Sequence, residues 1–182
     1  MRAFGLAVLT AAFTVAGLVA QGRNATRVSA GLEPNQEVPV VLSPQASGVF
    51  NAVINDDTQT IEYELSFSGL QANTTQSHIH VAQASVNGAI VVWLCQTAAA
   101  PDLVNPQTQQ CPLQGGTITG TIVATDIRAA ATQGLSATLS PSDRFDRFVA
   151  ALRAGEAYAN VHSAQSPGGE IRGQIRVGGG HQ

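Results

Sequence analysis

The chain has 182 residues, a formal net charge of −3 and no lysine. Its eight arginines after Arg2 are outnumbered by twelve acidic residues, which argues against a nucleic-acid partner and against a polybasic patch for a membrane surface. A chain of this length can bury a proper hydrophobic core, so a single domain that does not depend on many disulfides is the simplest expectation.

The first twenty residues have the layout of a secretory signal peptide. Arg2 is followed by an uncharged apolar run that ends at Ala20, and polar residues follow. The same run is near the roughly 17-residue minimum for a membrane span, so an uncleaved N-terminal anchor is the alternative. Cleavage predicts a secreted, extracellular or periplasmic protein without membrane contact. We expect a linker over 21–27, one domain over 28–177 and a flexible tail over 178–182.

The rest of the chain shows the two-residue alternation of half-buried antiparallel strands. In residues 60–68 the apolar side chains fall on one face and Glu62, Glu64 and two serines on the other. Asp56 and Asp57 favour a tight turn before this strand. Further strands are expected at 47–55, 77–82, 89–94, 117–123, 157–162 and 170–177. About seven or eight short strands predict an all-β fold, an antiparallel Greek-key-like sandwich or barrel.

One covering helix is expected at about 140–154. Ser140 can cap its N-terminus, with Pro141 at the first helical position and Gly155 just past the end. Its apolar residues form one stripe, which indicates packing against the sandwich. The alanine-rich segment 126–134, closed by Gly134, is a second helical candidate.

The two cysteines, Cys95 and Cys111, are the only ones in the chain. In an oxidising compartment such a pair is expected to form a disulfide, which would close the loop 96–110. A thiolate metal or redox pair is the alternative, but the spacing is not that of a CxxC motif. On the chain-entropy model this closure stabilises the fold by about 3 kcal/mol.

Three stretches carry a resemblance to a known family. They are LEPNQEVP near the start, SHIHVAQASVNGAIVVWL in the middle and GEAYANVHSAQSPGGEIRGQI near the end. Together they resemble the CHRD (chordin) domain family, in the form of a stand-alone secreted bacterial-type member, over roughly residues 28–177. The resemblance implies an extracellular β-rich domain and little about reaction chemistry. The cysteine-rich modules that bind growth factors in chordin have no counterpart in a chain with two cysteines.

The histidines provide the candidate site. Residues two apart in a strand face the same way, so His78 and His80 project together, as do Tyr158, Asn160 and His162. If the two strands are neighbours, three imidazoles converge in a set suited to Cu²⁺ or Zn²⁺, with Asn160 and Tyr158 as candidate supporting residues. Two alternatives stay open: hydrogen bonds that fix strand register without an ion, and a role in acid–base catalysis.

These observations favour a secreted, non-enzymatic binding or structural module that carries a transition metal, copper or zinc. Its partner would be an extracellular protein or the metal ion itself. The alternative is a copper-dependent redox protein of superoxide-dismutase-like architecture, because such an enzyme also uses an H-x-H strand. That enzyme needs a further copper histidine, and only His181 remains, in a glycine-rich tail. No catalytic residues are assigned. Glu170 and Arg172 are expected to face outward together, as a surface pair or in contact with the adjacent loop.

Overall fold

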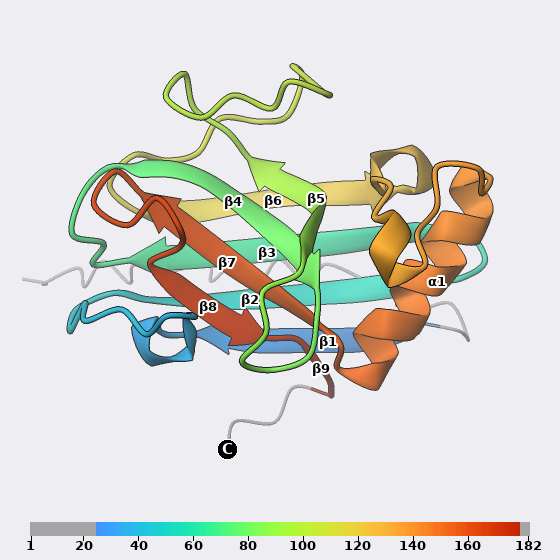
Figure 1. The fold of residues 1–182 in the computed structure, drawn as a ribbon, viewed down its shortest axis with the longest axis horizontal. Coiled ribbons are helices and arrows are strands. Elements are labelled where there is room, and N and C mark those ends of the chain that lie inside the picture. The colour runs from blue at the N-terminus through green and yellow to red at the C-terminus, as the bar shows by residue number, and fades with distance from the viewer. Residues whose placement is uncertain (1–24, 179–182) are drawn as a thin grey trace, which may run out of the picture.

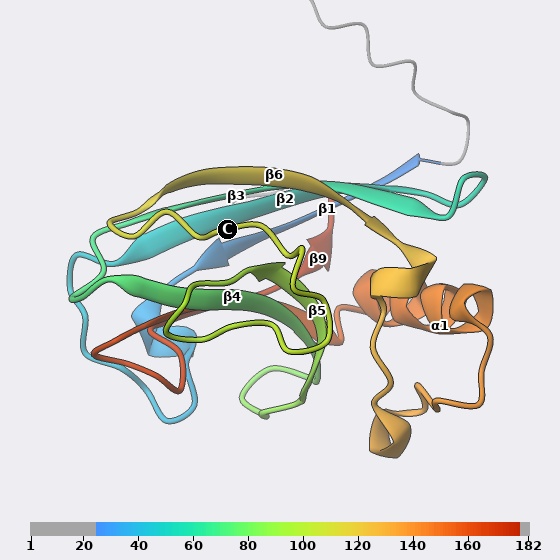
Figure 2. The same cartoon turned by 90° about the horizontal axis from the view of Figure 1, so that it is seen from above.

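The computed structural model describes residues 25–178, and it consists of two antiparallel sheets packed face to face (Figure 1 and Figure 2). The larger sheet has five strands in the order β6-β3-β2-β1-β9. Its strands are β1 (Ala25–Leu32), β2 (Ser47–Asn55), β3 (Thr60–Ser68), β6 (Gly116–Val123) and β9 (Arg176–Val177). The signal peptide expected over residues 1–20 and most of the expected tail lie outside the described residues. Within the described range, no helix is long and apolar enough to cross a membrane.

The smaller sheet has four strands in the order β5-β4-β7-β8. They are β4 (Thr74–Val81), β5 (Ala89–Cys95), β7 (Ala157–Ser163) and β8 (Ile171–Gln174). The fold is therefore all-β, as predicted, and it is a sandwich of two separate sheets rather than a closed barrel.

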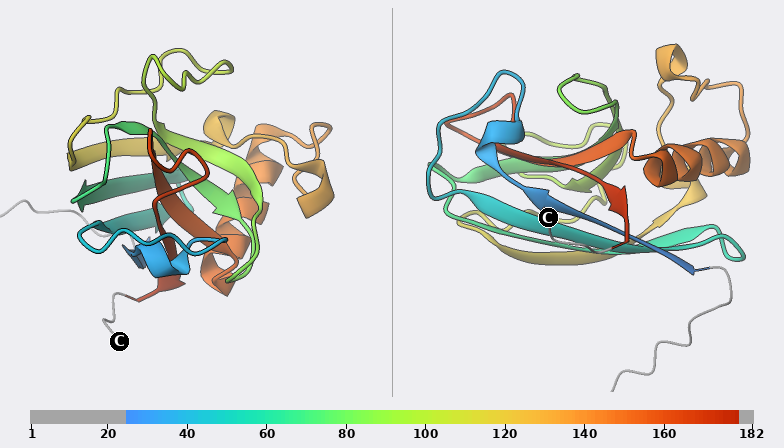
Figure 3. Two further views of the ribbon diagram at one scale, coloured as in Figure 1. Left: turned by 60° about the vertical axis from the view of Figure 1, so that its left-hand side comes forward. Right: turned by 90° about the horizontal axis from the view of Figure 1, so that it is seen from below.

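The last predicted strand is divided between the two sheets. Residues 170–177 were expected to form one strand, but β8 belongs to the smaller sheet and β9 to the larger. Ile175 lies between them, fully buried, and its N–H donates to the carbonyl of Ala157. The chain thus crosses from one layer to the other here, which ties the two sheets together (Figure 3).

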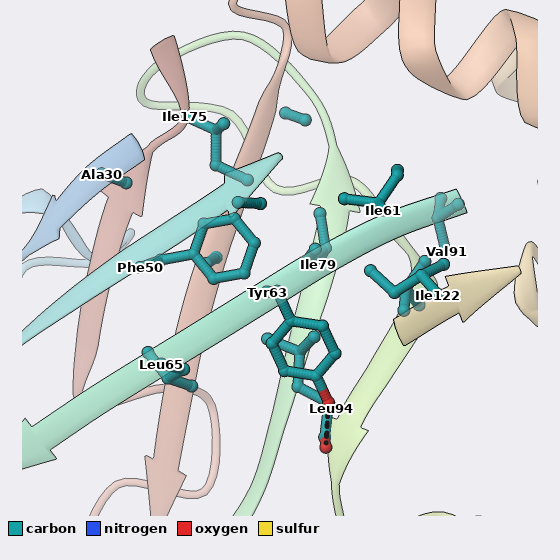
Figure 4. Close-up of a cluster of buried hydrophobic side chains, with 14 of the residues drawn as sticks. Ala30, Phe50, Ile61, Tyr63, Leu65, Ile79, Val91, Leu94, Ile122 and Ile175 are labelled. Atoms are coloured by element: carbon teal, nitrogen blue, oxygen red, sulfur yellow. Dashed lines mark hydrogen bonds between the residues drawn. The ribbon is translucent and has the colours of Figure 1, made fainter. Parts of the chain in front are cut away.

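The space between the sheets is filled by the alternating apolar residues of the strands. Phe50, Tyr63 and Leu65 of the larger sheet point toward Ile79 and Leu94 of the smaller one (Figure 4). The hydroxyl of Tyr63 donates to the carbonyl oxygen of Leu94, so the one polar atom of this buried ring is satisfied. The alternation in β3 is the one expected from the sequence, since its apolar residues are buried and Glu62 and Glu64 are exposed.

The predicted covering helix is present as α1 (Pro141–Ala154), beside one end of the sandwich (Figure 2). The hydroxyl of Ser140 accepts a hydrogen bond from the N–H of Asp143, and Gly155 ends the helix in the left-handed region with φ of 73°. Its buried apolar stripe consists of Phe145, Phe148, Val149 and Leu152. The second helical candidate, 126–134, is not an α-helix. It contains a 3₁₀ turn at Ala131–Gln133, and its first residue, Asp126, ends another 3₁₀ turn that begins at Ala124.

Three connecting segments cover the outer face of the smaller sheet, which is the face turned away from the larger sheet (Figure 2). They are residues 33–46, 82–88 and 164–169. Hydrogen bonds connect them to the sheet and to each other: Asn87 donates to the carbonyl of Val38, and Arg172 donates to the carbonyls of Gln83 and Val86. As a result every residue of β7 is buried, on both faces of the strand.

Candidate metal centre

The three predicted site histidines come together on this covered outer face. Strands β4 and β7 are antiparallel neighbours, with His78 opposite Asn160, His80 opposite Tyr158, and Gln76 opposite His162. The condition under which the three imidazoles converge, that the two strands are neighbours, is therefore met. The alternation also holds, because Ile79 lies in the core between the sheets while its two neighbours project outward.

The imidazoles are close enough to share one ion. One ligand nitrogen from each of His78, His80 and His162 can be chosen so that all three lie within 4.8 Å of one another. Nδ1 of His78 is 3.2 Å from Nε2 of His162. Two nitrogens bound tetrahedrally to one zinc ion at its usual bond length are about 3.3–3.4 Å apart, so this pair already has the required separation. In the metal-free protein the same distance is a hydrogen bond between the two rings.

Backbone carbonyls fix the orientation of two of the rings. Nδ1 of His80 is 3.0 Å from the carbonyl oxygen of Gly88, and Nδ1 of His162 is 3.0 Å from that of Pro167. Because a carbonyl oxygen only accepts, each Nδ1 carries the proton and each Nε2 has a free lone pair. This is the arrangement that usually orients metal-binding histidines. Nε2 of His80 and Nε2 of His78 are buried without a hydrogen-bond partner among the described residues.

Burial keeps the histidines neutral. It lowers the pKa of His78 to about 2, with a further contribution from the neighbouring His162. The pKa of His162 falls to about 4, again mainly because of burial, although its bond to the Pro167 carbonyl opposes the shift. The pKa of His80 is also lowered by burial. All three rings are therefore uncharged near pH 7, so an ion does not compete with the protonation of charged imidazolium groups. Binding through Nδ1 of His78 requires only that the proton of this neutral ring move to Nε2.

Aromatic and cationic groups hold the site from both sides. The ring of Tyr158 stacks on His80, with centroids 4.7 Å apart and planes at 2°. The guanidinium of Arg172 lies on Tyr158, 3.4 Å from the ring centroid. The indole of Trp93 meets His78 edge-on, with centroids 4.2 Å apart, and its Nε1 is buried without a partner in the described chain.

Glu37 is a buried carboxylate beside the histidine cluster, and it was not predicted from the sequence as a site residue. It is 5% exposed and lies on the covering segment 33–46. Burial raises its pKa to about 7, while the charge of Arg172, the N–H of Val38 and the side chain of Asn160 act in the opposite direction. Gly169 has φ of 126°, and a Cβ there would lie 2.3 Å from Oε1 of Glu37, so the covering segment 164–169 needs glycine at this point.

The outward surface pair predicted for Glu170 and Arg172 is wrong. Glu170 is fully buried, and its carboxylate accepts hydrogen bonds from Ser43, Ser163 and the backbone N–H of Gln71. Arg172 is 1% exposed and donates to Asn87 and two loop carbonyls. Contact with neighbouring loops, the other half of the expectation, is confirmed for both.

The predicted disulfide is present between Cys95 and Cys111. The loop that it closes is anchored by Asp102, which accepts hydrogen bonds from its own loop and from Arg128. The guanidinium of Arg128 lies 5.2 Å from the centroid of the Trp93 ring. The loop therefore reaches the edge of the histidine cluster through one arginine and one tryptophan.

Comparison with known proteins identifies one family. The model of the CHRD domain family matches residues 28–175, which is most of the chain. No curated protein and no protein of solved structure gives a significant match.

Proposed function

Because the chain belongs to the CHRD domain family, we propose that it is a non-enzymatic extracellular module that binds a transition-metal ion through His78, His80 and His162. The observation that supports this most strongly is the convergence of three buried, neutral imidazoles. Two of them, His80 and His162, have Nδ1 hydrogen-bonded to a backbone carbonyl, so that Nε2 carries the lone pair that can bind an ion. The disulfide supports an oxidising compartment.

Copper is the ion that we expect to bind most tightly. Imidazole nitrogens suit both copper and zinc, and affinities for a given site generally rise to Cu²⁺ and fall again at Zn²⁺. Three protein ligands leave a further coordination position, which an oxygen ligand can occupy. Tyr158 would support the site by fixing the plane of the His80 ring.

The test is metal binding by purified, metal-stripped protein. An ion that binds only the native state, at a free concentration a thousand times its Kd, raises the free energy of unfolding by about 4 kcal/mol. This corresponds to a Tm rise of roughly 8–16 °C for a domain of this size. Trp93 is the only tryptophan and lies against His78, so Cu²⁺ should also quench its fluorescence.

Two variants make the measurement specific. His78→Ala combined with His80→Ala should abolish both the Tm rise and the quenching. His181→Ala removes the remaining histidine and should behave as the wild type. An unchanged Tm in the wild type, or an equal rise in the double variant, would refute the metal site and favour the alternative in which the histidines only fix strand register.

A further inference from the structure

Buried polar atoms without partners are concentrated around the histidines. Among the described residues, the atoms of this kind include His78 Nε2, His80 Nε2, Trp93 Nε1, Asn160 Oδ1 and Glu37 Oε1. A buried polar group without a partner has lost its hydrogen bonds to water and gained none in return, so a cluster of such groups on one face indicates a place where a ligand is held. Asn160, which the sequence predicts only as a supporting residue of the metal site, contributes an unpaired amide oxygen to this cluster.

Asn160 lies at the centre of the face. It is 2% exposed, it is paired across the sheet with His78 on one side and Arg172 on the other, and its side chain projects toward the same covered layer as the histidines. No other described position of β7 has both a metal-binding histidine opposite it in β4 and another two residues along its own strand.

The side chain of Asn160 lies beside both Glu37 and His80, and it influences the pKa of each group. Nδ1 of His80 carries the ring proton, so Nε2 of His80 is an acceptor, as is Oδ1 of Asn160. Both atoms are buried without a partner among the described residues. A cation held between these two acceptors would satisfy both of them. With Oδ1 turned toward the cation, the NH₂ group of Asn160 is left to donate to Glu37.

We infer that Asn160 Oδ1 is the fourth ligand of the metal held by His78, His80 and His162, and that Glu37 is the positioning residue that aims it. This inference rests on the proposed metal-binding function. The resulting donor set is three nitrogens and one neutral amide oxygen. Amide oxygen occurs elsewhere as a weak fourth ligand of copper, which favours copper as the resident ion. Glu37 also places a buried carboxylate beside a site whose ligands are all neutral.

The first test replaces the oxygen donor. Asn160→Leu keeps the branched shape and the number of heavy atoms of the side chain, and we expect it to weaken Cu²⁺ binding at least tenfold and to change the electron paramagnetic resonance spectrum of the copper-loaded protein. Asn160→Asp retains an oxygen and should retain binding. Asn51→Leu, on the exposed face of the larger sheet, is the matched control and should leave affinity and spectrum unchanged. A wild-type spectrum in Asn160→Leu overturns the assignment, even if its affinity is reduced.

The second test separates positioning by Glu37 from a merely structural role. Glu37→Gln keeps an acceptor for the Asn160 NH₂ group and should preserve the copper spectrum. Glu37→Leu removes the acceptor and should alter the spectrum and weaken binding roughly 10–100-fold, the usual effect of losing a residue that orients a ligand. Identical spectra in Glu37→Leu and the wild type would overturn the positioning role.

A third measurement needs no variant and is not affected by misfolding. Protein labelled with ¹³C at the asparagine side-chain carbonyl is loaded with Cu²⁺ and examined by electron–nuclear double resonance. Coordination by Oδ1 predicts a resolved ¹³C coupling, and its absence overturns the inference. If the wild-type protein binds no copper at all, the proposed function itself fails. If copper binds without the ¹³C coupling, only the Asn160 assignment fails.

Discussion

Acidification of the metal-free protein should destabilise it, in a pH range set by the buried histidines. In the unfolded chain a histidine titrates near pH 6.5, whereas in the native state the pKa values of His78 and His162 are lowered to about 2 and about 4. Below pH 6.5 the unfolded state therefore binds protons that the native state does not. Stability is lost as pH falls from the unfolded value toward the native ones.

Glu37 has the opposite effect over part of the same range. Its native pKa is raised from 4.5 to about 7, so between these values the native state holds a proton that the unfolded state has released. This contribution makes the native state more stable as pH falls from 7 to 4.5. It offsets the contribution of one histidine to the pH dependence of stability.

The net slope follows from these signs. Each titrating group changes the free energy of unfolding by about 1.4 kcal/mol per pH unit. His78 and His162 lower it as pH falls, and Glu37 raises it, so the net loss from these three groups is about 1.4 kcal/mol per pH unit. His80, whose pKa is lowered too, adds up to the same amount again. Between pH 6 and pH 4.5 the free energy of unfolding should fall by about 2–4 kcal/mol, out of the about 5–15 kcal/mol typical of a folded domain. The corresponding fall in Tm is roughly 4–16 °C.

The measurement is thermal unfolding followed by circular dichroism between pH 7.5 and 4.5 in the presence of a chelator. Glu37→Gln is the informative variant, because it removes the opposing contribution and should steepen the slope by about 1.4 kcal/mol per pH unit. A Tm that is constant from pH 7 to pH 5, or a variant whose slope equals that of the wild type, would refute the reasoning about these buried groups.

Three further predictions concern the scaffold and the chemistry. Replacing Cys95 and Cys111 by alanine should lower stability by about 3 kcal/mol, measured by urea unfolding, because it releases a loop with a sequence separation of 16; a loss below about 1 kcal/mol would contradict this. Ser140→Ala should cost about 1 kcal/mol, since it removes the acceptor for the N–H of Asp143; an unchanged unfolding midpoint would show that the cap contributes nothing. Copper-loaded protein should not turn over superoxide in a standard assay, and catalytic turnover would favour the redox alternative.

Strand alternation was enough to predict which side chains of the site share a face of their strand. Alternation alone places His78 with His80, and Asn160 with His162, and the neighbouring position of β4 and β7 completes the cluster. What the sequence did not reveal is that the face is covered. The covering segments have no periodicity, so the burial of Arg172 depends on contacts with residues more than eighty positions away, such as Asn87.

Glu37 was missed for the same reason. It lies in the stretch LEPNQEVP, which carried part of the family resemblance, but nothing local distinguishes it from the exposed Glu33 four residues earlier. Its burial follows from the folding of segment 33–46 over the smaller sheet. A polar residue in a loop becomes a candidate site residue only when the loop's position is known.

The composition of β7 indicates that the polar side chains on its outer face have a role other than stabilising the fold. A strand buried on both faces normally reads as a continuous apolar run, because each buried polar group must be desolvated. β7 is buried throughout, yet its outward positions are Tyr158, Asn160 and His162. Apolar residues there would fill the same space without unpaired atoms such as Asn160 Oδ1. The polar face therefore carries a stability cost, and binding of an ion by His162 and its neighbours is the event that would recover it.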